Sequence, residues 1–188
     1  MKLKQLTALT FTAGIILTSC GSSTSTDNNQ TTTETTTPKT ASEKAKLTIF
    51  NDISKTRQAL SGNGIGDLGD WKSDQMGGFM SITNYYQFGD GMPQNNIAYY
   101  LESQDESYIQ TAKLTLNINN KSEKKEAIAK FKDVATATFK SLSLEIPQGL
   151  IEAIDKGKEF ESSNDNFSTS LKLDKSKIET WTVKIETK

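Results

Sequence analysis

Residues 109–118, with the sequence IQTAKLTLNI, carry the pattern that decides the fold. Within them Leu114, Leu116 and Ile118 alternate with the polar residues Thr115 and Asn117. Successive side chains of a β-strand point to opposite faces, so this alternation predicts a strand with one apolar face and one polar face.

The segment that follows predicts the longest helix of the chain. Asn120 or Ser122 can cap its beginning, and Asn120 with Glu123 has the spacing of a capping box. The helix must end before Pro147. Residues 150–157 predict a shorter helix that ends near the glycine at 157. Apolar residues recur at helical spacing through the long helix: Ile128, Phe131, Val134, Ala135, Phe139 and Leu142.

Further strands are predicted on both sides of this helical region. Residues 79–88 predict one strand, a turn follows at 89–93, and residues 97–102 predict the next strand. The tail predicts strands at 167–173 and 181–185, with a turn at 175–177 between them. The strand at 79–88 is expected to place four side chains on one face: Met80, Ile82, Tyr86 and Phe88.

The N-terminal part of the domain predicts an amphipathic helix over residues 47–60, with a short strand at 47–50 as the alternative. The element order is then helix, three strands, two helices and two strands. Consecutive strands with short turns favour an antiparallel sheet. We therefore predict an α+β fold for a single domain at residues 42–188, with about five strands and two or three helices packed on one face.

The first residues are typical of a secretory signal peptide. A cationic start at residues 1–5 precedes an apolar run of twelve residues, Leu6 to Leu17. In a helix this run spans about 18 Å, which is shorter than the roughly 30 Å core of a bilayer. We assign residues 1–19 to a signal peptide.

The residues Leu17-Thr18-Ser19-Cys20 resemble the lipobox of bacterial lipoproteins. The resemblance implies that Cys20 becomes the mature N-terminus and carries a diacylglyceryl thioether and an N-acyl chain. Two or more acyl chains give stable anchoring, so the implied membrane partner is bound through Cys20. No Asp follows in Gly21–Ser23, which by analogy favours an outer membrane and its periplasmic side. A Gram-positive host and an ordinary signal peptide with an incidental cysteine remain as alternatives.

Residues 20–41 connect this anchor to the domain. They are rich in Ser and Thr, with a low-complexity run at residues 31–38. Such a composition buries too little apolar surface to offset the entropy of ordering, so we predict a disordered tether. O-glycosylation of the threonines is the alternative to a plain spacer.

The composition excludes several kinds of chemistry. The chain of 188 residues has 22 Lys and Arg, 23 Asp and Glu, one Cys and no His. There is thus no Ser-His or Cys-His nucleophile pair, no imidazole metal site and no cysteine-rich zinc cluster. The formal charge of −1 is not that of a nucleic-acid-binding protein, which needs an excess of Lys and Arg.

Aromatic residues provide the first candidate site. Tyr85, Tyr86, Tyr99 and Tyr100 lie on two neighbouring predicted strands, where one tyrosine of each pair faces the core and the other faces out. We select Tyr86 and Tyr100 as candidate partner-binding residues, with stabilisation of the sheet by aromatic pairs as the alternative. Trp71 is a further candidate partner-binding residue, with a place in the core as the alternative, and Trp181 is expected in the core.

A glycine-rich loop at residues 62–70 provides the second candidate site, with Asp67 and Asp70 as partner-facing residues. It does not match a dinucleotide-binding fingerprint, because a helix precedes it. Asp67, Asp70 and Asp74 lack the closing Glu of a calcium loop. We therefore assign no metal, no cofactor and no catalytic residue.

The expected function is that of a lipid-anchored envelope protein whose head is a non-catalytic binding or assembly module. Its partner is an envelope protein or a glycan. An inhibitor or immunity lipoprotein that acts through the glycine-rich loop is one alternative. A hydrolase that uses a metal or carboxylates such as Asp67 and Asp70 is the other.

Overall fold

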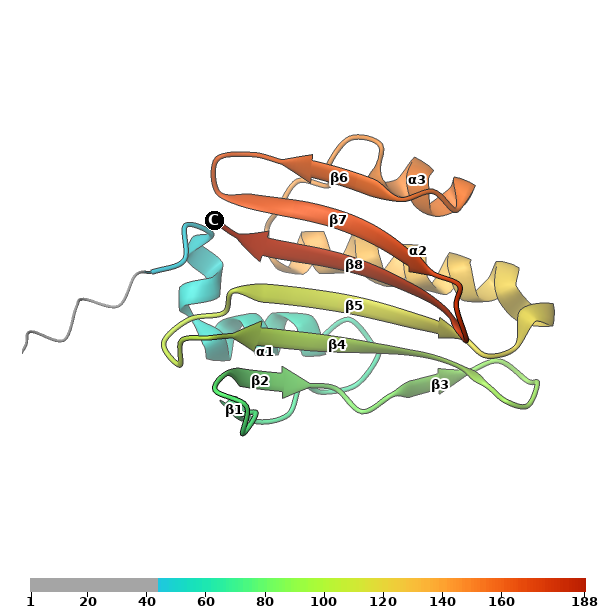
Figure 1. Ribbon diagram of the computed structural model, residues 1–188, viewed down its shortest axis with the longest axis horizontal. Helices are drawn as coiled ribbons and strands as arrows, with labels where there is room; N and C mark the ends of the chain where they lie inside the picture. Colours follow the sequence, from blue (N-terminus) through green and yellow to red (C-terminus); the bar gives the residue numbers. More distant parts are fainter. Residues whose placement is uncertain (1–43) are drawn as a thin grey trace, which may run out of the picture. The chain divides into compact units, whose positions relative to one another are not determined.

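One antiparallel sheet of eight strands organises the computed structural model, which describes residues 44–188 (Figure 1). Its strands follow the order β1-β2-β4-β5-β8-β7-β6, and β3 pairs with β4 along the same edge as β2. The strands are β1 (Lys72–Ser73), β2 (Phe79–Ile82), β3 (Tyr86–Phe88), β4 (Asn95–Ser103), β5 (Thr111–Ile118), β6 (Phe160–Ser163), β7 (Phe167–Asp174) and β8 (Glu179–Thr187).

Helices pack on one side of this sheet, and Figure 1 shows the other side uncovered toward the viewer. They are the 3-10 helices η1 (Thr48–Asn51) and η2 (Lys121–Glu123) and the α-helices α1 (Ile53–Ser61), α2 (Lys124–Ser141) and α3 (Leu150–Lys156). The predicted α+β class with an antiparallel sheet is confirmed, although the sheet has eight strands rather than about five. No helix among residues 44–188 is long and apolar enough to span a bilayer.

Several predictions fall outside the described residues. These are the signal peptide at 1–19, the lipidated Cys20, the tether at 20–41 and the domain boundary at residue 42. The described residues themselves belong to one compact unit.

The core lies between the sheet and the helices. On β5 the side chains of Leu114, Leu116 and Ile118 are buried, as the alternation predicts. From the helix side, Phe131 of α2 meets Trp181 of β8 edge-on, with ring centroids 6.4 Å apart. Trp181 is thus confirmed as a core residue, and it is 1% exposed.

The N-terminal helix is divided in two. Residues 48–51 form η1, and α1 begins separately after Asp52, whose side chain accepts a hydrogen bond from the N–H of Lys55 at 2.9 Å. An aspartate in this position satisfies a backbone N–H that the helix itself cannot pair. The alternative of a strand at 47–50 is wrong, and so is a single helix over 47–60.

The single strand predicted for residues 79–88 is also wrong. Ile82 pairs with Tyr100 in β4, and Tyr86 pairs with Ile97. Three residues of the edge chain, 83–85, therefore oppose two residues of β4, which is the arrangement of a bulge. The extra residue reverses the side-chain alternation. Met80 and Ile82 consequently face away from the helices, whereas Tyr86 and Phe88 face toward them.

Two side chains hold the 3-10 helix η2, which leads directly into α2. The Asn120 side-chain oxygen accepts from the N–H of Ser122 at 3.1 Å, as an N-cap residue should. Glu123 does not complete the predicted capping box, because its Oε1 accepts from the N–H groups of Asp90 and Gly91 at 3.1 and 2.8 Å. These two bonds attach the turn between β3 and β4 to the start of the helix.

Candidate functional site

The face of the sheet opposite the helices is the candidate site, which we call the open face. It carries alternate side chains of β4, β5, β8, β7 and β6. Because neighbouring strands lie about 4.8 Å apart, side chains in one cross-strand row are close neighbours. The central row consists of Glu161, Ser170, Lys184, Lys113 and Tyr100.

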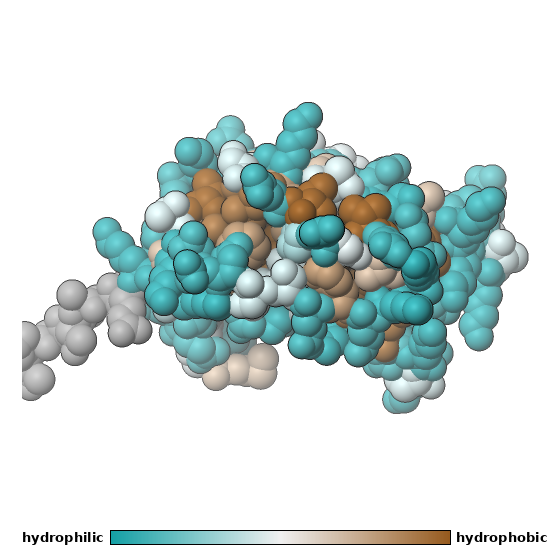
Figure 2. Space-filling view, turned by 90° about the horizontal axis from the view of Figure 1, so that it is seen from above, coloured by the Kyte–Doolittle hydropathy of each residue, from teal (hydrophilic) through white to brown (hydrophobic). Residues whose placement is uncertain are grey.

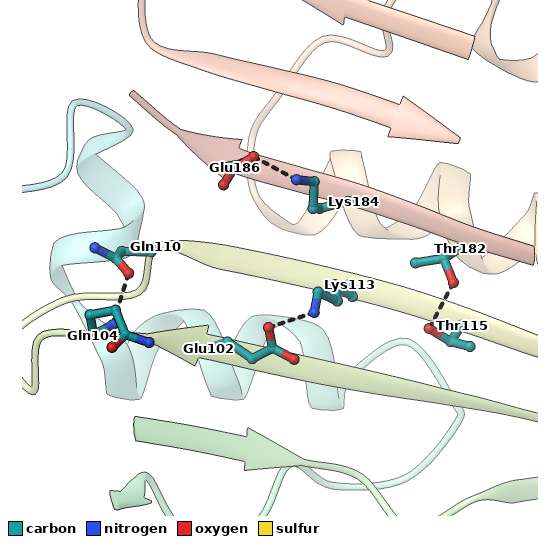
Figure 3. A network of polar contacts seen from close by, with 8 residues as sticks. All are labelled: Glu102, Gln104, Gln110, Lys113, Thr115, Thr182, Lys184 and Glu186. Carbon is teal, nitrogen blue, oxygen red and sulfur yellow. Dashed lines mark hydrogen bonds and ion pairs between the residues drawn. The ribbon is translucent and has the colours of Figure 1, made fainter. Parts of the chain in front are cut away.

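Two lysines occupy the middle of the open face. Lys113 and Lys184 are direct cross-strand partners, an arrangement in which like charges repel. Figure 3 shows that each ammonium group is directed to a carboxylate instead. The Lys113 Nζ lies 2.5 Å from Glu102, and the Lys184 Nζ lies 2.6 Å from Glu186. The central lysines are therefore neutralised within the face.

The neighbouring part of the open face, on β4, β5 and β8, is joined by hydrogen bonds between side chains. The hydroxyls of Thr115 and Thr182 are 3.3 Å apart (Figure 3). Asn117 donates to the Asn96 side-chain oxygen at 2.9 Å and accepts from the Thr180 hydroxyl at 2.9 Å. These polar groups bind one another across three strands, which fixes their positions without a ligand.

The structure does not bring the two selected tyrosines together. Tyr100 is on the open face, where its hydroxyl lies 2.8 Å from that of Tyr85. Tyr86 is on the helix side, stacked on Phe88 with the Nζ of Lys130 5.3 Å from its ring centroid. The open-face pair is thus Tyr85–Tyr100. The bulge at 83–85 places Tyr85 instead of Tyr86 on the open face. Alternation of apolar and polar residues does not predict such a bulge.

Burial raises the pKa of the Tyr100 phenol well above its ordinary value. The hydrogen bond with Tyr85 and the charge of Glu102 act in the same direction. Tyr100 is therefore a neutral hydroxyl over the physiological pH range, able to donate and to accept a hydrogen bond.

The other selected residues lie beside β1 and β2, on the same edge of the sheet as β3. Trp71 stacks on Phe79 with ring centroids 6.3 Å apart, and its indole N–H donates to the carbonyl of Glu106 at 3.0 Å. Asp67 is exposed, and the Asp70 side chain is 96% exposed with Arg57 3.7 Å away. Within residues 44–188 no group of three or more metal-ligating side chains is placed to hold an ion.

A hollow of about 520 Å³ lies over β6, β7 and β8, and sequence reasoning did not find it. We call it the serine trough; its lining includes Ser163, Ser168, Ser170, Lys172, Lys184 and Glu186. At its border the Lys172 Nζ hydrogen-bonds Glu161 at 2.6 Å. This contact lowers the pKa of Glu161 and raises the pKa of Lys172. The alternating serines of β7 are visible in the sequence, but the pattern does not predict the partner strand β6.

The edge of the sheet beyond the trough differs in character from the open face. Figure 2, seen from above, shows apolar surface across the side of the molecule where Figure 1 has β6 and α3. Partly exposed apolar residues of this region include Ile146, Ile151 and Phe160. The open face is therefore a polar surface bordered by an apolar edge.

No protein-family model matches the chain, and no curated protein or solved structure shows significant similarity to it. The geometry of the open face is therefore the basis for the proposed function.

Proposed function

We propose that this chain is a lipid-anchored protein of the bacterial cell envelope whose head is a non-catalytic binding module. The partner is bound on the open face. One observation carries the proposal: within residues 44–188 the helices cover one face of an eight-stranded sheet, and the other face carries an ordered set of polar side chains.

The order of these side chains supports recognition. Lys113 and Lys184 are held by Glu102 and Glu186, so their charges have fixed positions before a partner arrives. Complementary charges and hydrogen-bonding groups in fixed positions select a partner and its orientation. Polar groups that are already ordered also lose little conformational entropy on binding.

The anchor and the tether complete the proposed mechanism. Acyl chains on Cys20 hold the protein at the membrane, by resemblance to the lipobox family, and the tether at 20–41 lets the head search the space next to it. Confinement of this kind raises the effective concentration of the head for a partner in the same compartment. The outer membrane, on its periplasmic side, remains the proposed location.

Replacement of the lipobox cysteine tests the anchoring part. Cys20→Ser should abolish incorporation of labelled palmitate and move the protein from the membrane fraction to the soluble fraction. Acyl labelling and membrane retention that persist in this variant would refute lipid anchoring at Cys20.

A charge reversal tests the binding surface. The full chain, with and without Lys113→Glu, is used to capture partners from gently solubilised envelope, and these are quantified by mass spectrometry. The variant should lose the specific partner, because two carboxylates then face each other on the open face. Lys177→Glu, in the exposed turn between β7 and β8, is the matched control and should retain it. Equal capture by both variants would exclude the open face as the binding surface.

A further inference from the structure

A groove on the helix side, formed by η2, α2 and α3, plays no part in the proposed function. Its volume is about 630 Å³, and we call it the lysine groove. It combines four ammonium groups with a single carboxylate and with apolar side chains. The lining residues are Lys121, Ser122, Lys124, Lys125, Ile128, Ala129, Lys132 and Asp155.

Two of the four lysines carry charge that no carboxylate balances. The Lys132 Nζ lies 2.7 Å from Asp155, and the Lys124 Nζ lies 2.7 Å from a carboxylate of β8. Lys121 and Lys125, by contrast, are exposed and form no ion pair within the described part of the chain. The groove is therefore locally positive, although the whole chain has a formal charge of −1.

The positive charge continues along the exposed side of α2. Lys125, Lys132 and Lys140 follow one another at spacings of seven and eight residues, which places them on one side of a helix. Ala129 and Thr136 lie between them on that side, so no carboxylate of α2 interrupts the stripe. A basic stripe on a helix that is apolar on its other side is typical of contact with an anionic membrane surface.

Apolar surface adjoins the lysine groove. On α3, Ile151 precedes Asp155 by four residues and so lies on the same side of that helix. Ile151 is also part of the apolar edge, the surface seen in Figure 2. Lysines beside apolar side chains suit the interface of a bilayer, because the apolar groups enter the boundary of the acyl chains while the ammonium groups reach the lipid phosphates.

We infer that the lysine groove and the stripe on α2 dock the head on an anionic phospholipid bilayer. Lipid phosphates supply the negative charge that Lys121 and Lys125 lack, and an anionic surface attracts lysines that come within a Debye length of it. The occupant is a bilayer because the proposed acyl anchor holds the head beside one. The inference goes beyond the proposed function, since it adds a second membrane contact on the side opposite the open face.

The length of the proposed tether permits this docking. Residues 20–41 can extend over at most about 75 Å, whereas the nine residues of β8 span about 30 Å. An anchored head can therefore lie with its helices against the bilayer. Because the helices and the open face are on opposite sides of the sheet, the open face then points away from the membrane and toward its partner (Figure 1).

Quenching of an introduced tryptophan tests the docking. The full chain with Ala129→Trp, at an exposed position of the groove, is reconstituted with vesicles of brominated phosphatidylcholine, with or without an equal part of phosphatidylglycerol. Ser54→Trp, at an exposed position of α1, is the matched control, and wild type gives the background from Trp71 and Trp181. With phosphatidylglycerol we expect added quenching for Ala129→Trp and none for Ser54→Trp. The added quenching should be lost without phosphatidylglycerol and at high salt.

Charge substitutions identify the groups responsible. In the Ala129→Trp chain, Lys121→Gln/Lys125→Gln should lower the ratio of docked to undocked heads roughly 30-fold, which abolishes the added quenching. Lys55→Gln/Lys72→Gln removes the same charge from exposed lysines outside the groove and should leave the quenching unchanged. Near-ultraviolet circular dichroism of each variant verifies that the fold is retained.

Three results would overturn the inference: equal quenching of the two introduced tryptophans, equal quenching with and without phosphatidylglycerol, or quenching that survives Lys121→Gln/Lys125→Gln. Capture of an acidic envelope protein that requires these two lysines, without added quenching, would assign the groove to a protein and overturn it as well.

The outcome is separate from that of the proposed function, because Lys113→Glu changes the open face and not the lysine groove. If docking fails but partner capture still depends on Lys113, the proposed binding function stands and the inference falls. If docking is observed but Lys113→Glu leaves capture unchanged, only binding at the open face is refuted.

Discussion

The two faces of the sheet use neighbouring residues for different purposes. On β8 the side chains of Trp181, Val183 and Ile185 are at most 2% exposed and pack under the helices. Between them, Thr182 and Lys184 point to the open face and remain partly exposed. Burial of apolar surface dominates folding free energy, whereas exposed ion pairs contribute little. The comparison indicates that one face holds the fold together and leaves the other available for recognition.

Substitution of adjacent residues of β5 should show the largest difference in stability between the two faces. Leu116 is fully buried and Thr115 is half-buried on the open face. Leu116→Ala should lower the free energy of unfolding by about 3 kcal/mol, through lost burial and a residual cavity. Thr115→Ala should lower it by less than about 1 kcal/mol. Urea unfolding of the two variants gives both values, and similar losses would show that the two faces contribute equally to stability.

Two adjacent tyrosines of β4 provide a second matched pair. Tyr99 is fully buried, and its hydroxyl lies 2.6 Å from that of Thr138 and accepts from Asn63 at 2.9 Å. Tyr99→Phe removes both bonds and leaves the Asn63 side-chain N–H without its acceptor, although Thr138 still donates to the carbonyl of Val134. We therefore expect a loss of about 1–3 kcal/mol in the free energy of unfolding. Chemical denaturation measures it, and a loss below about 0.5 kcal/mol would mean that the buried network adds little.

An ion pair between the exposed Lys124 and the largely buried Glu179, 2.7 Å apart, makes the helix side sensitive to pH. Burial opposes ionisation of Glu179, but hydrogen bonds from Lys124 and Trp181 outweigh it and lower the pKa of the carboxyl. The stability it contributes is thus present above the unfolded-state pKa of about 4.3 and is lost as pH falls through the lower folded-state pKa.

Glu179→Gln tests this contribution. At about pH 7 the variant should be less stable by about 1–2 kcal/mol, because the hydrogen bonds to an ionised acceptor are lost. The difference should shrink below about pH 4 as the wild-type carboxylate becomes protonated. Urea unfolding at several pH values measures it. A constant difference across this range would show that the charge of Glu179 does not stabilise the fold.

The sequence predicts the buried side of the sheet better than the exposed side. Alternation in β5 identifies its buried residues, because each apolar side chain is two positions from the next. It fails between β2 and β3, where one additional residue exchanges the faces, and it cannot detect strands as short as β1 and β6.

The candidate site is harder to predict from the sequence, because it depends on how the strands are aligned with one another. The contact between Lys113 and Glu102 and the row that joins Ser170 to Lys184 depend on cross-strand register. Register is set by the turns and by packing against the helices, so a single sequence does not state which polar residues become neighbours. Tyr100 faces the open side of the sheet, as the alternation predicts, but its partner there is Tyr85 rather than Tyr86.

The smallest effect on stability is expected at the second tyrosine of the β4 pair. Tyr100→Phe removes only the hydroxyl that meets Tyr85 on the exposed face, so the free energy of unfolding should fall by less than about 1 kcal/mol near pH 7. Because the pKa of Tyr100 is raised in the fold, its contribution is present below about pH 10, the unfolded-state pKa, and is lost as pH rises further. In an ultraviolet titration of tyrosine ionisation, wild type should show one tyrosine that ionises at a higher pH than the others, and Tyr100→Phe should lack it.

Comparing Tyr100→Phe with Tyr99→Phe shows whether the two faces differ in their contribution to the free energy of unfolding. The same chemical change is made at neighbouring residues of one strand, so propensity and unfolded-state effects largely cancel between them. A loss at Tyr100 equal to that at Tyr99 would show that the open face also stabilises the fold. In that case its ordered polar groups would be explained by stability, and their use in recognition would need a different argument.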